Sequence, residues 1–431
     1  MNRYSNSSTS RSRVYTWPKY YGWFVVALAA CFYCYEYFLR ISPSVMSDQL
    51  RQAFHLDGAG FGNLADFYYY IYTPLQFFVG ILMDRFGPRK LLSLACLSCA
   101  LGAFLFSASH VFALAALGRF LIGFGSAFAF VGALKIATIW LPKNRFAMVS
   151  GGITALGMVG AMIGDVGLTA LVAHQGWRGT MVDAAVAGLC LAVVLFIFIH
   201  DKGDEHKRSM TEKMEATFPY LLRGLLHALR KPRMWLYGII GTTLYMSLTV
   251  FAELWSIPYY HVVERISPIH AASLNTAVFL GWAVGGPILG FLSDRIRSRQ
   301  KVLLISSVFA FFVSVYLFVF HPYLSYTAMY TTLFIFGLST SAQVLVFAAG
   351  KELNSEKMAG TSIALINGFV MIGGLVFQPL IGWILDLEWH GKMAHGLRVF
   401  SAHDYEHAML VIPVCMLISV ACCLFLKRDR I

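Results

Sequence analysis

The chain has 431 residues, of which 58% are hydrophobic and only 13% are charged, and its mean hydropathy is +0.64. A soluble protein of this length needs far more polar surface, so the composition excludes the soluble globular class. The formal net charge of +12 would suit a nucleic-acid partner, but the cations are distributed as in a membrane protein, and we expect no nucleic-acid binding.

Apolar segments of about 20 residues recur along the whole chain, and each can span ~30 Å of hydrocarbon as a helix. The backbone of a spanning segment must satisfy its own hydrogen bonds in lipid, and these segments are too continuously apolar for barrel strands. We therefore predict an all-α integral membrane protein in contact with the lipid bilayer. Its twelve transmembrane helices are expected at residues 20–41, 61–82, 88–109, 111–140, 146–173, 178–200, 234–262, 269–294, 301–320, 326–351, 359–386 and 405–426.

Polar segments divide the chain into two six-helix bundles. Residues 1–19 are polar and rich in serine, which predicts a disordered cytoplasmic tail. The first apolar run has aromatic and charged flanks and no small-residue cleavage site soon after it, so we expect no signal peptide. The longest polar connection, residues 201–233, carries an amphipathic stretch, YLLRGLLHAL, that can lie along the membrane surface. It separates an N-terminal bundle at 20–200 from a C-terminal bundle at 234–426, and a short tail follows at 427–431.

Lysine and arginine gather on one side of the predicted membrane. Most of the 34 lie in the two tails and in the loops on the same side as the tails. The opposite side holds only Arg51, Arg178, Arg265, Lys392 and Arg398. By the positive-inside rule both termini are cytoplasmic, which agrees with an even number of helices. We expect a multi-pass plasma-membrane protein, located in the inner membrane if the source is a bacterium.

The sequence shows no strong motif for metal or nucleotide binding. The pairs Cys31/Cys34 and Cys96/Cys99 have the CxxC spacing of zinc or redox sites, but they lie inside apolar segments, which favours core packing. No P-loop GxxxxGK[ST] is present, and we expect neither an enzyme, nor a cofactor, nor a metal site. Metal binding is the alternative to a solvated loop for four histidines before the last helix, His390, His395, His403 and His407.

A short signature occurs twice. Residues 80–90 read GILMDRFGPRK, and residues 290–301, which begin 210 positions later, read GFLSDRIRSRQK. Both copies follow the second helix of their half. This register indicates an internal duplication, as in transporters built from parallel repeats.

The loop signature resembles that of the major facilitator superfamily, G-x-L-x-D-R-x-G-x-R-K. RFLIGFG, which contains Arg119, resembles a second motif of the superfamily, and GWR at 176–178 is also common there. The resemblance covers the whole chain and implies two pseudo-symmetric six-helix bundles around a central cavity, alternating access and a monomeric state. From this motif and its repeat we expect the gating residues to be Gly80, Asp84, Arg85, Gly87, Arg89, Lys90, Asp294, Arg295, Arg299 and Arg119. A structural role is the alternative for Arg119.

The charges of the signature lie at the expected cytoplasmic mouth. Charges there can pair across the two halves when the protein faces outward, and these pairs must break when it faces inward. The alternative is that Arg85, Arg89 and Lys90 are ordinary positive-inside residues.

Ionisable groups inside a span each cost roughly 2.5–3.5 kcal/mol on insertion scales, so each is a functional candidate. They are Glu36, Arg40, Asp66, Arg119, Lys135, Asp165, Asp183 and Glu253. Lys135 can snorkel to the interface, and Asp183 lies near an outer helix end, so we discount both.

Polar residues form stripes on several of these helices. In FYCYEYFLR of the first helix, Tyr33, Glu36, Tyr37 and Arg40 share one face by helical spacing. Such stripes face a water-filled cavity or a partner helix. Pairing of Glu36 with Arg40 at a helix contact, and packing of the tyrosines, are the structural alternatives. The predicted substrate-binding set is Arg40, Tyr33, Tyr37, Tyr69, Tyr70, Tyr245, Thr249, Glu253, Gln343, Asn367 and Gln378.

The first helix, YEYFLRISPSVM, resembles that of the organophosphate antiporters and the anion:cation symporters of the superfamily. In those branches an arginine at the place of Arg40 receives the phosphate or carboxylate of the substrate. Helix 7 presents Glu253 where the phosphate antiporters have a second arginine, which favours a carboxylate. An organic acid fits, and so does a zwitterion such as an amino acid or a small peptide.

Proton coupling requires a carboxylate that binds and releases a proton during the cycle. Burial favours the neutral form of a carboxyl group, and a neighbouring arginine favours the charged form. A substrate carboxylate that competes for Arg40 would release Glu36 to take up a proton, so the substrate and the proton would favour each other's binding. The proton-coupling candidates are Glu36, Asp66 and Glu253.

The sequence therefore predicts a proton symporter that imports a small carboxylate-bearing solute. The alternative is an exchanger or exporter of metabolites, a polycarboxylate siderophore or drugs. Drug efflux is the less favoured form, because Asp165 replaces the proline of the drug-antiporter motif on helix 5. A sensor that no longer transports is a further class, and nothing in the sequence favours it.

Overall fold

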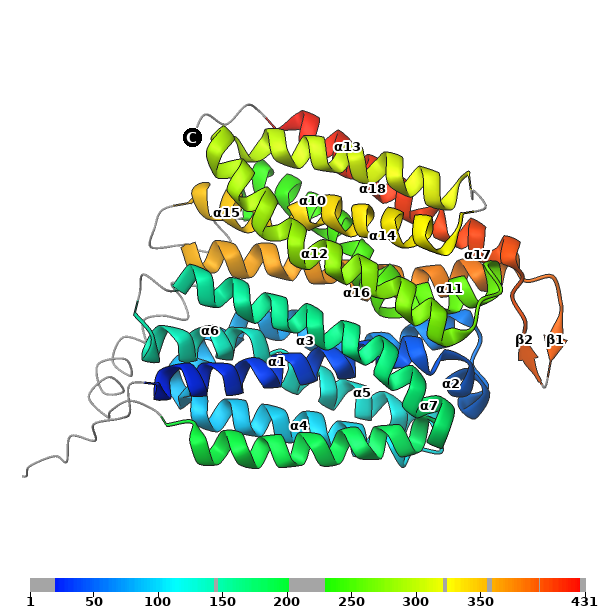
Figure 1. The fold of residues 1–431 in the computed structure, drawn as a ribbon, viewed down its shortest axis with the longest axis horizontal. Helices are drawn as coiled ribbons and strands as arrows, with labels where there is room; N and C mark the ends of the chain where they lie inside the picture. Colours follow the sequence, from blue (N-terminus) through cyan, green and yellow to red (C-terminus); the bar gives the residue numbers. More distant parts are fainter. Residues whose placement is uncertain are drawn as a thin grey trace, which may run out of the picture.

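The computed structural model describes residues 20–142, 146–200, 229–320, 324–354, 359–394 and 396–426. The predicted tails, the linker up to residue 228 and His395 lie outside the described residues, and of Asp84 only the backbone is described. The helices run side by side in two stacked halves (Figure 1). We call the end at which the first helix begins and the last helix ends the terminal face, and the opposite end the distal face.

The first half contains seven described helices. They are α1 (Tyr21–Val45), α2 (Ser47–Phe54), α3 (Gly58–Phe86), α4 (Pro88–Ser107), α5 (Phe112–Ser126), α6 (Ala129–Trp140) and α7 (Phe146–Phe198). The element α7 reverses direction at Gly176, where φ is 77°, so it crosses the molecule twice. Together α5 and α6 make one crossing, and α2 is a short helix at the distal face.

The second half follows the same plan with more interruptions. Its elements are α10 (Pro232–Met246), η2 (Ser247–Trp255), α11 (Ser256–Val263), α12 (Pro268–Ile296), α13 (Arg299–Phe318), α14 (Tyr326–Thr340), η3 (Ser341–Val344), α15 (Leu345–Glu352), α16 (Ala359–Glu388), α17 (Ala402–Met409) and α18 (Val411–Phe425). The runs α10–η2–α11, α14–η3–α15 and α17–α18 are each one crossing. The predicted twelve membrane helices are thereby confirmed.

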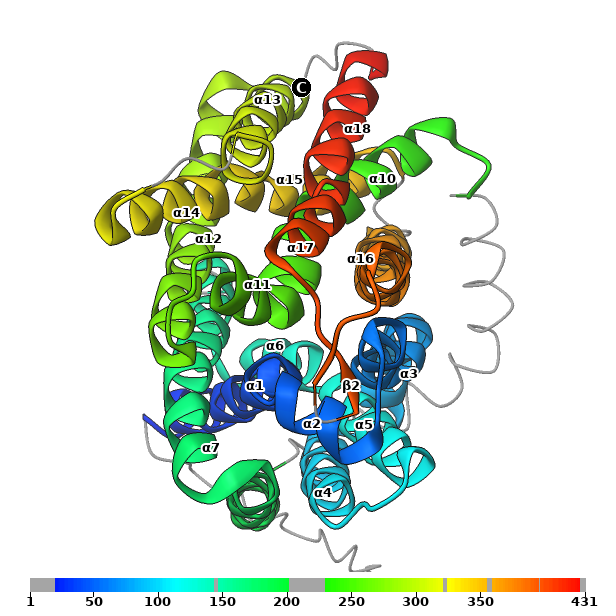
Figure 2. The ribbon, with the colours of Figure 1, turned by 90° about the vertical axis from the view of Figure 1, so that its right-hand side faces the viewer.

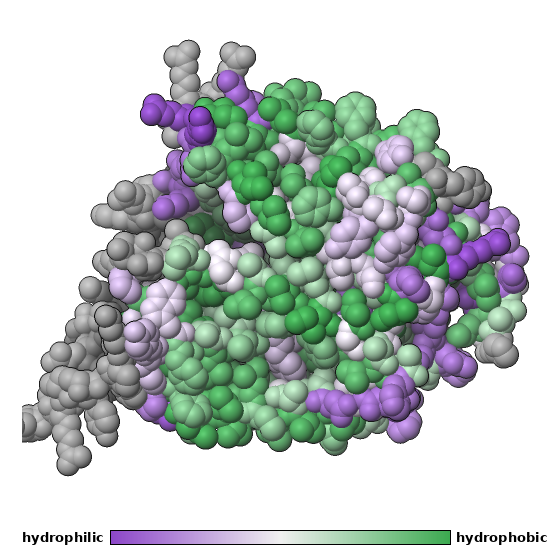
Figure 3. Space-filling model, viewed as in Figure 1, coloured by the Kyte–Doolittle hydropathy of each residue, from purple (hydrophilic) through white to green (hydrophobic). Residues whose placement is uncertain are grey.

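The surface has the character of a membrane protein. Among the described residues, ten helices are long and apolar enough to span a bilayer, because the two passes of α7 count once and α3 is not among them. In Figure 3 hydrophobic side chains cover the middle of the molecule, and hydrophilic residues gather at both ends. This is the pattern expected where a band of ~30 Å faces lipid tails.

The two halves meet along two pairs of helices. Helix α3 packs against α16, and α7 packs against α12, and both pairs lie side by side in Figures 1 and 2. Helix α1 also contacts η2 and α11 of the other half. A polar side chain on the inner face of α1 therefore lies where the halves meet.

A hairpin closes the distal face. Strands β1 (Met393–Ala394) and β2 (Leu397–Arg398) pair antiparallel, with Met393 opposite Arg398. Figure 2, which looks onto this face, shows the hairpin of the second half lying over α2 of the first half. His403 and His407 were expected in a solvated loop, but both lie on α17 beside this hairpin, so that expectation is wrong for these two residues.

Two local features carry functional weight. Gly87 has φ 78° between α3 and α4, a conformation that only glycine adopts readily, and Pro88 then starts α4. This explains the glycine of the loop signature. The second feature is η2, a nine-residue π-helix inside the seventh crossing that contains Glu253. Segments of this type concentrate at functional sites.

Candidate functional site

Arg40 lies buried on the face of α1 that meets the second half. Its Nη2 lies 2.6 Å from Oε1 of Glu36, and its Nε donates a hydrogen bond of 2.8 Å to the same oxygen. The predicted pair on one turn of helix therefore forms. The second oxygen of Glu36 is buried and accepts no hydrogen bond among the described residues.

A second carboxylate reaches Arg40 from the other half. Oε1 of Glu253, on η2, lies 3.5 Å from Nη1 of Arg40. The hydroxyl of Tyr69, on α3, donates a hydrogen bond to Oε2 of Glu253. One guanidinium thus joins two carboxyl groups from opposite halves, and all three side chains are buried.

Tyrosines surround the guanidinium. The Tyr68 hydroxyl donates to Glu36 and accepts a hydrogen bond of 3.0 Å from Nε of Arg40. The ring centroids of Tyr37 and Tyr72 lie 4.4 and 5.2 Å from the guanidinium carbon, which is the range of cation–π contacts. We call Arg40, Glu36, Glu253, Tyr68 and Tyr69 the Arg40 cluster.

The sequence did not predict Tyr68 or Tyr72. On α3, polar spacing in the sequence predicts a face through Asp66, Tyr69 and Tyr70. In the structure, the face that meets Arg40 passes through Tyr68, Tyr69 and Tyr72. Each residue turns an α-helix by about 100°, so an error of one position rotates a stripe past its partner. The i, i+4 spacing of Tyr68 and Tyr72 was the available signal.

Tyr70 does not belong to the site. Its side chain is 38% exposed, and its hydroxyl donates to Asn63 on the same helix at 2.9 Å. The reason is again its position on α3, because it points away from the face that meets Arg40. The prediction of Tyr70 as a binding residue is therefore corrected.

Other predicted residues line the same interface. Tyr37 and Tyr245 place their hydroxyls 3.4 Å apart across the two halves. The ring of Tyr33 packs against that of Tyr37, with centroids 5.2 Å apart. Asn367 donates a hydrogen bond of 3.1 Å to Gln76 of α3. The tyrosines of α1 and α10 and the amides of α3 and α16 therefore meet between the halves.

Thr249 and Gln378 support the π-helix. Nε2 of Gln378 donates to the backbone oxygen of Thr249 at 2.5 Å, and the indole of Trp255 donates to the backbone oxygen of Gln378 at 3.1 Å. The Thr249 hydroxyl donates to the Tyr245 carbonyl in its own helix, so its proton is already used. Gln343 is buried, and its side-chain nitrogen makes no hydrogen bond among the described residues.

Arg119 links three helices of the first half next to Arg40. It is buried on α5 and donates to the backbone oxygens of Leu39 at 3.0 Å and Ala65 at 3.2 Å. It therefore joins α5 to α1 and α3 within one half, away from the loop signature. Asp66 is buried near Arg119, and neither of its carboxyl oxygens accepts a hydrogen bond among the described residues.

Asp165 and Asn275 form a polar bridge between the halves. Nδ2 of Asn275, on α12, lies 2.7 Å from Oδ2 of Asp165, on α7, and 2.8 Å from the backbone oxygen of Ala252 on η2. Both side chains are buried. The sequence identified Asp165 as a candidate, and only the structure supplies its partner.

Two signature arginines of the terminal face contact residues of their own halves. Arg89 donates to the backbone oxygen of Phe196 at 2.9 Å. Arg299 lies 2.5 Å from Asp294 and 3.2 Å from Glu352. An ideal Cβ on the signature glycines Gly80 and Gly290 would meet no atom within 4 Å, and the side chains of Arg85, Lys90 and Arg295 are exposed. Figure 3 shows a recess between the halves beside this face.

The distal face, in contrast, is closed by close contacts. The carboxylate of Asp386, at the end of α16, accepts hydrogen bonds from the backbone nitrogens of Gly58 at 2.9 Å and Ala59 at 2.7 Å. These amides start α3 and have no partner within their own helix, and the positive end of the helix dipole favours an anion there. An ideal Cβ on Gly382 would lie 2.1 Å from the backbone oxygen of Gly58, so the two helices touch.

The hairpin extends this closure. Arg398 lies 3.0 Å from Asp386, and the guanidinium of Arg51, on α2, donates to the backbone oxygen of Arg398 at 2.7 Å. We call Asp386, Arg398, Arg51 and the first amides of α3 the distal network. The sequence suggested no role for these side chains, because they lie outside the spans, where charged residues are common.

The geometry agrees with the comparisons to known proteins. A model of the Major Facilitator Superfamily matches residues 26–387. The chain belongs to this superfamily. It is therefore a multi-pass membrane transporter protein and not an enzyme, and the resemblance of its loop signature is confirmed.

Curated relatives cover most of the chain. The probable sulfoacetate transporter SauU of Cupriavidus necator is 24% identical over 382 residues, which are 84% of this chain and 87% of that protein. The membrane sensor protein UhpC of Salmonella typhimurium is 24% identical over 388 residues, which are 83% of this chain and 84% of that protein.

A solved structure shows the same fold. It is a bacterial homologue of the human lysosomal transporter Spinster, crystallised in an inward-facing and occupied conformation. The match has a TM-score of 0.75 at 17% identity and covers 95% of this chain and 97% of that one. The predicted fold of two six-helix bundles is thereby confirmed.

Proposed function

We propose that this protein is a proton symporter that imports a small organic acid, whose carboxylate binds Arg40. The observation that carries this proposal is the Arg40 cluster, in which one buried guanidinium is shared by carboxyl groups of the two halves. A guanidinium can bind a carboxylate through two parallel hydrogen bonds. The relative SauU is named a probable sulfoacetate transporter, and sulfoacetate is an organic acid.

The two carboxyl groups are held unequally. Glu36 contacts Arg40 at 2.6 and 2.8 Å and also accepts from Tyr68. Glu253 contacts Arg40 through one ion pair of 3.5 Å. A substrate carboxylate that competes for Arg40 therefore displaces Glu253 more readily than Glu36.

Charge balance then couples the substrate to a proton. With both glutamates ionised the cluster carries a net charge of −1, and an unpaired buried charge costs several kcal/mol. A bound carboxylate adds one further negative charge, so uptake of a proton must accompany it. Glu253, which the carboxylate displaces from Arg40, is the group that takes the proton. Substrate and proton favour each other's binding, as symport requires.

A zwitterion would behave differently. Its ammonium group would neutralise Glu253 directly, and no additional proton would be needed. The number of protons moved with each substrate molecule therefore separates an organic acid from an amino acid or a small peptide.

The contact between Arg40 and Glu253 also joins the halves. Substrate binding breaks this link between α1 and η2. It therefore changes the relative stability of the inward-facing and outward-facing arrangements of the two halves. A ligand shifts such an equilibrium only by its differential affinity for the two states. This arrangement supports alternating access by rigid-body motion of the halves.

The first experiment screens purified protein for thermal stabilisation by organic acids, amino acids, dipeptides and sugar phosphates. We expect organic acids to raise the melting temperature. The probes are monocarboxylates, which add one negative charge, and sulfoacetate, whose sulfonate adds a second. Arg40→Ala should abolish the shift, and Arg40→Lys, which keeps the charge without the two-pronged geometry, should reduce it. Equal shifts in wild type and in both variants would exclude Arg40 as the binding residue.

The second experiment measures transport of the stabilising acid in proteoliposomes. Glu253→Gln should lose accumulation driven by a proton gradient but keep exchange of substrate between the two sides. Glu36→Gln should impair both activities, because Arg40 loses its closest partner. Unchanged proton-driven uptake by Glu253→Gln would contradict the coupling role of Glu253.

The same assay tests the alternatives. An exchanger or exporter would show counter-transport with no net uptake under the proton gradient. A sensor, for which the similarity to UhpC is the supporting observation, would bind the acid in the thermal assay but move none of it.

A further inference from the structure

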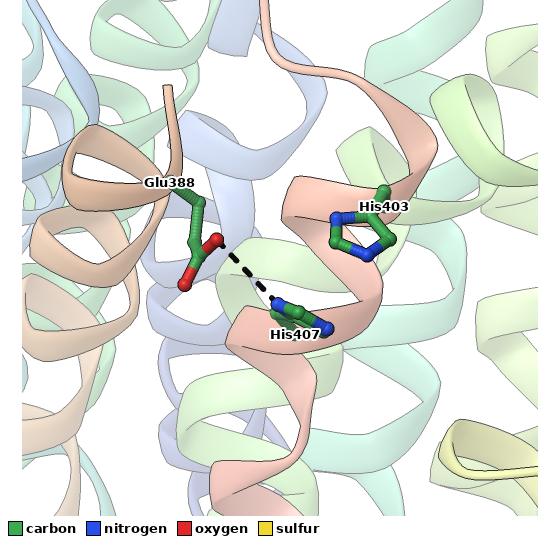
Figure 4. Close-up of side chains that lie close together, drawn as sticks. All are labelled: Glu388, His403 and His407. Atoms are coloured by element: carbon green, nitrogen blue, oxygen red, sulfur yellow. Dashed lines mark ion pairs between the residues drawn. The ribbon is translucent and has the colours of Figure 1, made fainter. Parts of the chain in front are cut away.

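Three metal-ligating side chains converge at the distal face, outside the Arg40 cluster. Glu388 is the last residue of α16, and His403 and His407 lie one helical turn apart on α17. Figure 4 shows the three side chains gathered at the same place, with Glu388 and His407 facing each other. Each offers one ligand atom, and these three atoms all lie within 4.8 Å of one another.

The distances suit a small divalent ion. Nδ1 of His407 lies 3.5 Å from Oε2 of Glu388, and the rings of His403 and His407 have centroids 4.0 Å apart. Zinc binds imidazole nitrogen and carboxylate oxygen at about 2.0–2.2 Å, so ligand atoms around a tetrahedral ion lie about 3.3 Å apart. The Glu388–His407 contact is close to this value. Rotation of the exposed side chains can close the remaining gap, which is at most about 1.5 Å.

The two histidine ligands lie on a helix whose start is fixed by hydrogen bonds. Two histidines at i and i+4 present their rings on one face of a helix, the arrangement that binds zinc in helical motifs. The start of α17 is fixed by a capping box, in which Ser401 and Asp404 exchange hydrogen bonds of 2.8 and 3.2 Å. Three protein ligands leave a fourth position for water.

The position of the cluster gives it a mechanical consequence. Glu388 lies two residues after Asp386, which binds the start of α3. Helix α17 begins four residues after Arg398, which pairs with Asp386. An ion bound to Glu388, His403 and His407 would therefore clamp both ends of the hairpin that closes the distal face.

We propose that Glu388, His403 and His407 bind a divalent transition-metal ion of the zinc class, and that the bound ion holds the distal hairpin closed. Binding of the metal is independent of the proposed transport function. Its effect on transport rests on that function, so the two are measured separately.

Metal binding is tested on the full-length protein after removal of any affinity tag and treatment with a chelator. Titration calorimetry with Zn²⁺ at pH 7.5 should show one saturable site, and Mg²⁺, which prefers all-oxygen ligands, should show none. Glu388→Gln should weaken Zn²⁺ affinity at least about tenfold, and the double variant His403→Ala/His407→Ala should abolish binding. His174→Ala, which removes an exposed histidine of α7 outside this cluster, is the matched control and should bind like wild type.

Absence of a saturable Zn²⁺ site in the wild type, or equal binding by the double variant, would overturn the metal site.

The mechanical part has its own measurement. Zn²⁺ should slow substrate exchange in proteoliposomes with wild type and not with the double variant, whose activity without metal should equal that of wild type. Saturable Zn²⁺ binding with no effect on exchange would keep the site and overturn its role in closing the distal face. Loss of all transport in every variant and in wild type would instead refute the proposed function while leaving the binding result intact.

Discussion

Replacing Asp386 with asparagine removes the negative charge that joins the two halves at the distal face. Its carboxylate accepts hydrogen bonds of 2.9 and 2.7 Å from Gly58 and Ala59, one amide on each oxygen. Asparagine keeps the shape but has a single acceptor oxygen and no charge. One amide of α3 therefore loses this partner in the closed state, whereas in an open distal face both amides meet water.

The expected size follows from the strength of such bonds. Hydrogen bonds to a charged group contribute roughly 1.5–3 kcal/mol each. Losing the charge and one of the two bonds therefore weakens closure by about 2 kcal/mol. The ion pair with Arg398, whose side chain is 34% exposed, adds at most about 1 kcal/mol. Since 1.4 kcal/mol is a factor of ten, the ratio of closed to open distal faces should fall at least about 30-fold.

The assay is a distance measurement by pulsed electron spin resonance. Spin labels replace Gln52 on α2 and Thr327 on α14, two exposed residues of opposite halves at the distal face, after the eight native cysteines have been substituted. We expect Asp386→Asn to increase the population at longer distances. Asp183→Asn is the control, because Asp183 accepts its hydrogen bond of 2.6 Å from Gln175 in the same half.

An unchanged distance distribution in Asp386→Asn would refute the reasoning, because it would show that the distal network does not set the conformational equilibrium. An equal change in Asp183→Asn would refute it as well, because any charge removed at this face would then have the same effect.

Three further substitutions test other contacts. Gly382→Ala places a methyl group 2.1 Å from a backbone oxygen of α3. The overpacking, worth about 1–3 kcal/mol, should lengthen the same spin-label distance. An equal effect of Gly290→Ala, whose methyl group faces open space, would contradict this. Asn275→Ala leaves Asp165 buried without its amide donor, so the melting temperature should drop by the equivalent of about 1–3 kcal/mol. An unchanged melting temperature would show that the bridge does not stabilise the folded protein. Arg119→Lys keeps the charge but loses the forked guanidinium that donates to two backbone oxygens. The melting temperature should therefore decrease. A wild-type melting temperature would mean that the charge alone suffices.

Local properties of the sequence determined the outline of this protein. Hydropathy predicted twelve membrane helices because a segment in lipid must satisfy its own backbone hydrogen bonds, whatever its neighbours are. Helical spacing predicted that Glu36 and Arg40 share a face, because residues four apart in a helix are neighbours in any fold. The resemblance of the loop signature and of the first helix then led to the superfamily and to Arg40 as the central cation.

Only the tertiary structure decided which groups Arg40 meets. Glu253 follows Glu36 by more than 200 residues. The spacing of polar residues on its helix indicated Glu253, but only the structure places it 3.5 Å from Arg40 and within a π-helix. Tyr68 contacts both Arg40 and Glu36, although the predicted face of its helix excluded it.

The physical reason is that the rotation of one helix about its axis, and the distance between helices, are set by packing against elements far away in the chain. The distal network shows this most plainly. Asp386 is an ordinary acidic residue at a helix end until the first amides of α3, more than 300 residues earlier in the chain, are brought against it.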